Sequence, residues 1–201
     1  MAEFCDLNAD LGESFGAWTM GNDAALLKVV SSCNIACGFH AGDPLTMQHT
    51  VAIALASGVA VGAHPSLPDL VGFGRRELRV DAAELYALTL YQISALDGFV
   101  RAAGGQLHHV KAHGALYGML ARESALAQAF VDAVVAAGPA LQIYGPDQGA
   151  LRRVCEDSLR HYVCEGFADR GYQANGQLVP RSQAGALLEL EAACAQGLAL
   201  A

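Results

Sequence analysis

Residues 107–117 read LHHVKAHGALY, an apolar run that opens into a lysine, a histidine and a glycine. Three other stretches have the same form, a short apolar run that ends in Gly, His or Asp. They are DLNADLGE at 6–13, CGFHAGD at 37–43 and GAHPS at 62–66. Each is typical of the carboxyl end of a buried strand, and in repeating β/α proteins such ends share the face that carries the chemistry. We therefore expect the four stretches to build one functional face.

Strand-like apolar runs alternate along the chain with helix-like stretches. The expected strands are Phe4–Asn8, Asn34–Gly38, Val59–Ala63, Leu107–Lys111, Leu141–Tyr144 and Tyr162–Glu165. The expected helices are Asn22–Ser31, Leu45–Ser57, Asp81–Ala103, Glu123–Ala137, Asp147–Leu159 and Ala184–Ala201. This alternation implies parallel strands joined by right-handed crossovers. Six units are too few for a closed eight-unit barrel, so we predict a single domain over residues 1–201, an incomplete or distorted β/α barrel. An open doubly wound sheet is the alternative.

The composition narrows the class of protein. Of 201 residues, 53% are hydrophobic and 16% charged, as expected when helices cover both faces of parallel strands. The net charge of -8 argues against nucleic acid or an anionic membrane surface as a partner. No apolar stretch approaches the roughly 20 residues of a membrane span, and no leader pattern precedes the first expected strand. We expect a cytoplasmic protein with free thiols, because the six cysteines include no C-x-x-C pair.

The first polar stretch carries acceptor side chains at alternate positions. Asp6, Asn8 and Asp10 would project to one side of a strand. Three oxygen-bearing side chains at a strand end suit a hard cation or a general base. A turn that caps a following helix uses the same residue types, so both interpretations stay open.

Three histidines fall at equivalent places in the pattern. His40, His64 and His113 follow different expected strands, and side chains from neighbouring strand ends can converge. Together with Asp10 they can form a mixed site for a divalent metal such as Zn, Mn or Co. The predicted ligands are Asp10, His64 and His113. Neutral imidazoles can equally serve as acid–base groups near pH 7, or as structural histidines in the core.

Further charged residues lie in the expected strand-end loops. Lys111 lies two residues before His113 and can counter a carboxylate or phosphate, or act as a base if its pKa is lowered. Glu165, Asp169 and Arg170 follow the last expected strand. They can hold the carboxylate of an amino acid, or form a surface ion pair.

Two arginines and an aspartate complete the candidates. Arg75 and Arg76 follow a Gly-Phe-Gly sequence in an expected loop, where they clamp an anion or stay solvated. Asp43 suits either a catalytic carboxylate or the N-cap of the next helix. The chain has no P-loop, no dinucleotide-binding fingerprint, no G-x-S-x-G and no H-E-x-x-H motif. A nucleotide would therefore be held by loop amides, by cationic side chains or by a metal.

Seven stretches that span most of the chain also carry a resemblance to a known family. They are DLNADLGE at 6–13, CGFHAGD at 37–43, GAHPSLPD at 62–69, GFGRR at 72–76, KAHGALY at 111–117, EGFADRGY at 165–172 and LVPR at 178–181. The chain resembles the LamB/YcsF family, the A subunits of prokaryotic ATP-dependent 5-oxoprolinase. The resemblance implies a β/α barrel related to glycoside hydrolases and polysaccharide deacetylases. It also implies opening of 5-oxo-L-proline to L-glutamate, coupled to ATP hydrolysis, in a complex with B and C subunits.

This resemblance adds roles to the candidate residues. The residues expected around the reacting centre are Asp10, His40, Asp43, Lys111 and His113. The expected substrate-binding residues are Asn8, Glu13, Arg75, Tyr117, Glu165, Asp169 and Arg170. Lys111 would counter the charge of an oxyanion or phosphate. ATP is the expected co-substrate, with a divalent metal and a homo-oligomeric state left open.

Two departures from the family pattern leave other functions open. The family usually has Pro where this chain has Ala112. Its members also continue past residue 201 to a strand with a Cys-Val-His-Gly-Asp-type segment, so we expect a barrel without its last strand. One alternative is a metal-dependent carbohydrate deacetylase or hydrolase, which would keep its metal and act without ATP. The other is a non-catalytic protein of the same complex that binds 5-oxoproline.

Overall fold

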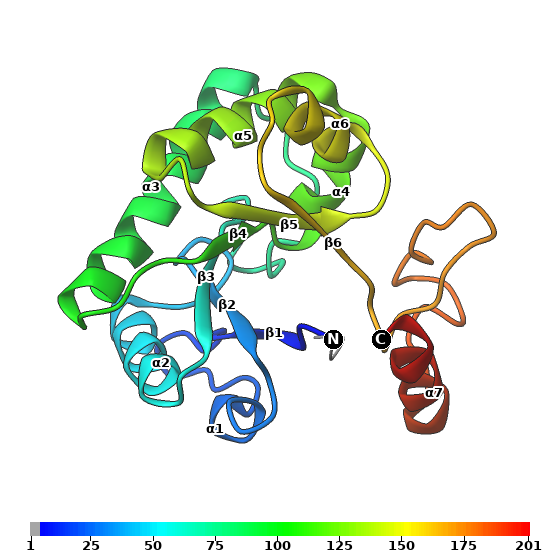
Figure 1. Cartoon of the computed structure of the whole chain (residues 1–201), viewed down its shortest axis with the longest axis horizontal. Coiled ribbons are helices and arrows are strands. Elements are labelled where there is room, and N and C mark those ends of the chain that lie inside the picture. Colours follow the sequence, from blue (N-terminus) through cyan, green and yellow to red (C-terminus); the bar gives the residue numbers. More distant parts are fainter. Residues whose placement is uncertain (1–4) are drawn as a thin grey trace.

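The strands of this protein form one parallel sheet in which neighbours in the sheet are also neighbours in the chain (Figure 1). The computed structural model describes residues 5–201. The strands are β1 (Asn8–Leu11), β2 (Ser32–Ala36), β3 (Ala60–His64), β4 (His109–Lys111), β5 (Gln142–Pro146) and β6 (Tyr162–Glu165). A doubly wound sheet reverses its strand order at a switch point, and this sheet does not. The sheet curls into a half-barrel, so the predicted incomplete β/α barrel is confirmed.

The helices follow the strands along the chain. They are α1 (Asp23–Leu26), α2 (Pro44–Ala56), α3 (Ala82–Ala102), α4 (Gly114–Arg122), α5 (Ser124–Ala137), α6 (Ala150–Asp157) and α7 (Leu190–Leu200). Helices α1 to α6 lie on the outside of the curled sheet, whereas α7 lies apart from them (Figure 1). Helix α2 begins where Asp43 accepts hydrogen bonds from the backbone N–H groups of Leu45 and Thr46. Asp81 directly precedes α3 and accepts a hydrogen bond from the backbone N–H of Glu84.

The two faces of the strands differ in character, as β2 illustrates. Successive side chains of a strand point to opposite faces. Cys33 and Ile35 are fully buried in the apolar core, which the strands share with α2, α3 and α5. Ser32 and Asn34 point into the half-barrel and form hydrogen bonds with Asn8 of β1. The inside of the half-barrel is therefore polar, and this is the side on which the site forms.

Some expected elements differ from the observed ones near the start of the chain. Strand β1 begins at Asn8, so the expected strand Phe4–Asn8 is wrong over residues 5–7, and Phe4 lies outside the described residues. The expected helix Asn22–Ser31 shortens to α1, because the chain must turn before β2 starts at Ser32.

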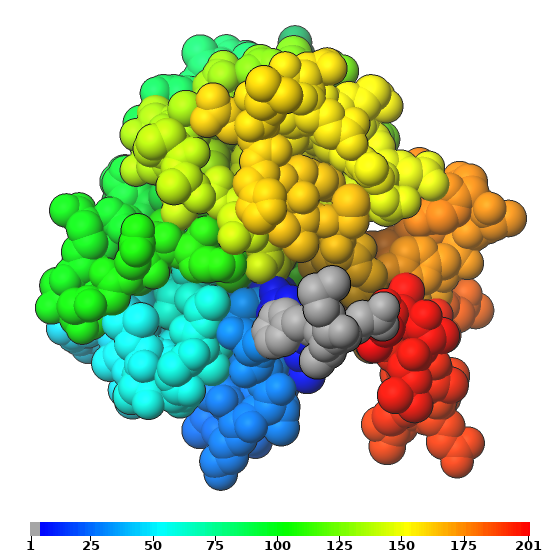
Figure 2. Space-filling model, in the orientation of Figure 1, coloured from blue at the N-terminus to red at the C-terminus, as the bar shows by residue number. Residues whose placement is uncertain are grey.

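Other differences fall in the second half. The sequence pattern does not indicate α4, because this helix begins with Gly114, contains Gly118 and has no side-chain cap. The expected helix Ala184–Ala201 begins only at Leu190, and residues 166–189 form turns and loops instead. In Figure 2 the segment after β6, coloured orange to red, projects at one side of the molecule. None of the helices between residues 5 and 201 has the length and hydropathy needed to cross a membrane.

Candidate functional site

A cavity of about 420 Å³ lies beside the carboxyl ends of β1, β3 and β4. Its charged and titratable lining residues are Asp10, Glu13, His64, Arg75, Lys111, His113, Tyr117, Arg170 and Arg181. Most of them come from three of the four strand-end stretches, those at 6–13, 62–66 and 107–117, which therefore meet on one face. Arg181 comes instead from the segment between β6 and α7.

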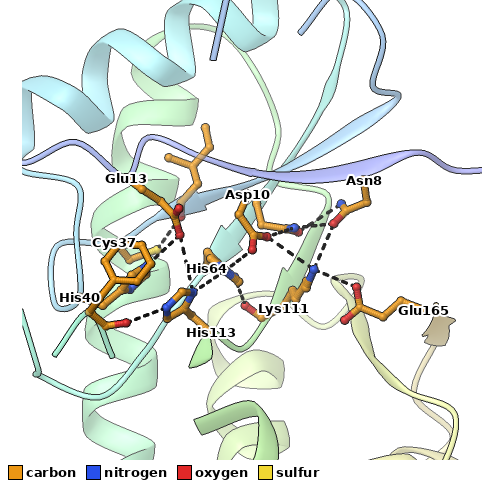
Figure 3. A network of polar contacts seen from close by, with 12 residues as sticks. Asn8, Asp10, Glu13, Cys37, His40, His64, Lys111, His113 and Glu165 are labelled. Carbon is orange, nitrogen blue, oxygen red and sulfur yellow. Dashed lines mark hydrogen bonds and ion pairs between the residues drawn. The ribbon is translucent and has the colours of Figure 1, made fainter. Parts of the chain in front are cut away.

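Four of the candidate residues form a compact cluster beside this cavity (Figure 3). Glu13, His40, His64 and His113 each offer one ligand atom, and these atoms all lie within 4.8 Å of one another. The rings of His40 and His113 are stacked, with centroids 3.8 Å apart. All three histidines are buried. This cluster can hold a metal ion. It contains the expected ligands His64 and His113, adds Glu13 and His40, and leaves out the expected ligand Asp10, which contacts His64 and Lys111 instead.

Backbone carbonyls fix the orientation of two imidazole rings. The Nδ1 atom of His64 is 2.8 Å from the carbonyl oxygen of Lys111, and Nε2 of His113 is 2.9 Å from that of Phe73. A carbonyl oxygen only accepts, so each of these nitrogens carries a hydrogen. The inner nitrogens, His64 Nε2 and His113 Nδ1, lie 3.0 Å apart. Histidines that bind a metal through one ring nitrogen commonly donate the N–H of the other nitrogen to a carbonyl or carboxylate, as these two do.

Electrostatics assigns different charges to these rings. Burial opposes a charge on His64, but the nearby Asp10 carboxylate outweighs it and raises the pKa of His64. Burial and the neighbouring His64 lower the pKa of His113 to about 2. Burial also holds the pKa of His40 well below its usual range. Without a metal, His64 is therefore the imidazolium, which donates from Nε2 to His113, whereas His40 and His113 are neutral.

Several buried polar atoms in the cluster lack a hydrogen-bond partner among residues 5–201. They are both ring nitrogens of His40 and Oε1 of Glu13. Leaving a buried polar atom unpaired costs about 1–3 kcal/mol. Burial also raises the pKa of the Glu13 carboxyl. These atoms are available to a ligand that the folded chain does not supply.

The loop of residues 70–76 closes over the histidines. The backbone of Phe73 is left-handed, with φ of 54°, and that of Gly74 has φ of 64°. A Cβ at Gly74 would lie 2.9 Å from His113 Cδ2 and 2.9 Å from His40 Cβ. Glycine is therefore required at this point for the loop to approach the rings and for Phe73 to orient His113.

Lys111 is a buried cation held between two carboxylates. Its Nζ lies 2.8 Å from Glu165 Oε2 and 3.5 Å from Asp10 Oδ1 (Figure 3). Burial opposes the charge, but the two carboxylates outweigh it and raise the pKa of Lys111. Of the two alternatives for Lys111, this environment favours the pairing with a carboxylate, because a base would need a lowered pKa.

A buried chain of hydrogen bonds supports Asp10 from inside the half-barrel. The ring nitrogen His109 Nε2 lies 2.7 Å from Asn34 Oδ1, and Asn34 Nδ2 donates to Asp10 Oδ1 over 2.8 Å. Asn8 contacts the same Asn34, so it belongs to this interior network and does not line the cavity. Asn34 is absent from the sequence-based candidates because it lies within a strand and not at its end.

Other expected site residues have a different environment. Asp43 caps α2 and also accepts hydrogen bonds from Gly16 N and Thr46 Oγ1, so it lies outside the cluster. Asp169 is exposed and does not line the cavity. Glu165 and Tyr117 lie near Lys111, and each has a buried oxygen without a hydrogen-bond partner in the described chain.

The sequence pattern alone does not single out Arg181. It lines the cavity together with Leu178, Val179 and Pro180. These residues are the LVPR stretch, and its presence among the seven family-like stretches is the signal that could have identified it.

Comparisons with known proteins agree with this geometry. The model of the LamB/YcsF family matches residues 5–200. The 5-oxoprolinase A subunit of Bordetella pertussis is 55% identical over 196 residues, which is 97% of this chain and 78% of the relative. That of Methylococcus capsulatus is 54% identical over 201 residues, 100% of this chain and 77% of the relative. The crystal structure of a lactam utilization protein from Thermus thermophilus superposes with a TM-score of 0.93. It is 45% identical and covers 98% of this chain and 80% of its own.

Proposed function

This chain belongs to the LamB/YcsF family, and we propose that it is the A subunit of a 5-oxoprolinase. It would act with B and C subunits to open 5-oxo-L-proline to L-glutamate while ATP is hydrolysed. The observation that carries the proposal is the 52–55% identity to 5-oxoprolinase A subunits along nearly the whole chain. The polar cavity at the strand ends supports it, because it offers both proton acceptors and cations.

The reaction must overcome the stability of the lactam amide. ATP transfers its terminal phosphoryl group to the lactam oxygen, and ADP leaves. Water then adds to the lactam carbon that carries this oxygen. The ring C–N bond breaks, which gives γ-glutamyl phosphate with a free amine. A second water molecule releases phosphate and leaves glutamate.

The cluster residues suit the water-addition step. The neutral ring of His40 and the carboxylate of Glu13 have free acceptor atoms for the proton that the attacking water loses, whereas the inner nitrogen of His113 already accepts from His64. Lys111 stays cationic and holds Asp10 and Glu165 in place. The side chain of Tyr117 lies at the same cavity and, with Glu165, would contact the substrate.

A divalent metal fits the same cluster. Glu13, His40, His64 and His113 would hold it, and the unpartnered atoms of His40 and Glu13 support this set. Two of the donor separations, 3.0 Å and 3.6 Å, lie near the edge of about 3.3 Å that a tetrahedral site with bonds of about 2.0 Å would require, and all four donor atoms lie within 4.8 Å of one another. When bound, such an ion lowers the pKa of a water molecule and polarises the lactam oxygen.

Cobalt binding tests the metal part of the proposal. Wild-type protein is expected to bind one Co²⁺, which is seen as visible absorption of a tetrahedral site. His40→Ala removes one ligand and should weaken Co²⁺ binding at least about tenfold. His49→Ala is the matched control, because His49 is exposed on α2 and should leave binding unchanged. Equal binding by both variants would exclude His40 as a ligand.

Glutamate release tests the catalytic part. The chain is mixed with its B and C partners, 5-oxo-L-proline and ATP, and each component is left out in turn. Glutamate is expected only in the complete mixture. Hydrolysis of an acetylated sugar by the chain and its metal, without ATP, would instead favour the deacetylase alternative that the histidine cluster also allows.

A further inference from the structure

Three arginines that line the cavity form no ion pair with a carboxylate of residues 5–201. They are Arg75, Arg170 and Arg181. The arginines found in ion pairs within this range are others, namely Arg76, Arg101, Arg122 and Arg152. The lining of the cavity is therefore rich in positive charge, although the net charge of the whole chain is -8.

Arg170 is the most unusual of the three because it is buried, with only 7% of its surface exposed. Its Nε and Nη2 atoms donate to the carbonyl oxygens of Ala186 and Val179, both over 2.8 Å. These carbonyls satisfy hydrogen bonds but carry no countercharge. Asp169 acts on the pKa of Arg170 but forms no ion pair with it in the described chain. A buried charge without a close charged partner is costly, and an anion bound beside it would lower that cost.

Arg75 connects this group to the histidine cluster. Its guanidinium lies 4.9 Å from the centre of the Phe73 ring, and the carbonyl of Phe73 orients His113. Burial and the charge of Arg181 lower the pKa of Arg75, and burial and Arg181 act in the same way on the pKa of Arg170. The guanidinium groups thus lie close enough for their charges to oppose one another. Glu13 and Asp10 near Arg75, and Asp169 near Arg170, offset only part of this effect, and a bound anion would offset more.

We propose that Arg75, Arg170 and Arg181 form a subsite for the oxygens of a phosphate group. A single carboxylate would leave two of the three charges unbalanced, whereas a phosphate chain carries several negative charges. The planar guanidinium fork also matches phosphate oxygens in pairs. That the phosphate belongs to ATP or to the phosphorylated lactam rests on the function proposed above. If the chain has that function, the subsite holds the phosphoryl group next to the histidine cluster.

Titration with pyrophosphate tests this subsite. The chain alone is titrated calorimetrically with sodium pyrophosphate in the presence of a chelator, so that no divalent ion mediates binding. Arg75→Gln and Arg181→Gln should each weaken binding about tenfold or more, because each removes a charged, forked donor. Arg153→Gln is the control, because Arg153 is exposed on α6 and does not line the cavity. Arg170 is left unchanged because it also supports the backbone.

A second titration with sodium L-5-oxoproline separates phosphate from carboxylate. Weaker pyrophosphate binding by both cavity variants, with the control unchanged, supports the subsite. Absence of pyrophosphate binding by the wild type, or equal affinities in all proteins, overturns it. Loss of 5-oxoproline binding alone also overturns it, because the arginines would then hold the substrate carboxylate. The titration needs neither the partner subunits nor turnover, so it tests the subsite separately from the enzyme activity. A chain that binds pyrophosphate but releases no glutamate with its partners would count against the proposed function and not against the subsite.

Discussion

At the scale of single residues, the site depends on which atoms carry hydrogens. His64 and His113 each give their outer N–H to a backbone carbonyl, so their inner nitrogens face each other over 3.0 Å. Such an arrangement is stable only with a proton or a cation between the rings. His40 has no hydrogen-bond partner for its ring nitrogens within the described chain. This arrangement fits the acid–base or metal-assisted step proposed for the cluster.

The loop that orients His113 depends on one buried carboxylate. Asp69 accepts hydrogen bonds from Arg76 Nε and from Gly72 N, and these bonds, with burial opposing them, lower the pKa of Asp69 to about 2. A carboxyl whose folded pKa lies below its ordinary value of 3.8 stabilises the protein above that value. This contribution is lost as the pH falls toward 2.

We therefore expect a pH-dependent difference between wild type and Asp69→Asn. The variant should unfold at a lower temperature near pH 6, and the difference should shrink as the pH falls from about 4 toward 2. Thermal unfolding followed by circular dichroism measures it. Asp97→Asn is the control, because the exposed pair of Asp97 with Arg101 contributes about 0.2–1 kcal/mol at most. A difference for Asp69→Asn that stays constant over this pH range would contradict the account.

At the scale of elements, the close packing of β3 on β4 holds the interior network. Gly62 of β3 pairs with His109 of β4, and a Cβ at Gly62 would lie 2.2 Å from His109 Nε2. The same nitrogen bonds Asn34, which in turn bonds Asp10. A side chain at Gly62 would therefore displace the support of Asp10, although it touches no cavity residue directly.

Gly62→Ala is expected to destabilise the protein by about 1–3 kcal/mol, since the buried ring and the strands have no room to adjust. Gly98→Ala provides a matched comparison, because Gly98 is exposed in α3 and an added Cβ would meet nothing within 4 Å. That change should stabilise the helix by about 0.5–1 kcal/mol. Denaturant unfolding of both variants measures the difference. A Gly62→Ala protein as stable as wild type would show that His109 can move freely.

The sequence predicted elements with strong local signals and missed those set by tertiary contacts. Strand β6 occurs at the expected residues, and α2 and α3 differ by one residue at each end, because capping aspartates mark their starts. Asp43 shows why a motif residue need not enter the site, since its Oδ1 caps α2 and its Oδ2 accepts from Gly16 N and Thr46 Oγ1. Arg181 could not be predicted from periodicity, because an irregular segment brings it to the cavity.

At the scale of the whole molecule, two parts of the chain contribute different chemistry to one cavity. The half-barrel supplies the histidine cluster and the pair of Lys111 with Glu165, while the segment between β6 and α7 supplies Arg170 and Arg181. Helix α7 holds this segment, because Gln196 donates to the carbonyls of Phe167 and Arg170. On the two proposals above, the strand-end face would join a centre for proton transfer to a subsite for phosphate.

Glutamate release by the His113→Ala variant tests the central claim most directly. The variant and wild type are each combined with B and C subunits, 5-oxo-L-proline and ATP, with Arg153→Gln as the control. Wild type and control are expected to release glutamate at equal rates, and His113→Ala should lose at least about a hundredfold, because the variant lacks the ring that pairs with His64 and stacks on His40 in the proton-transfer cluster. Undiminished release by His113→Ala would contradict the claim that the histidine cluster is the reacting centre.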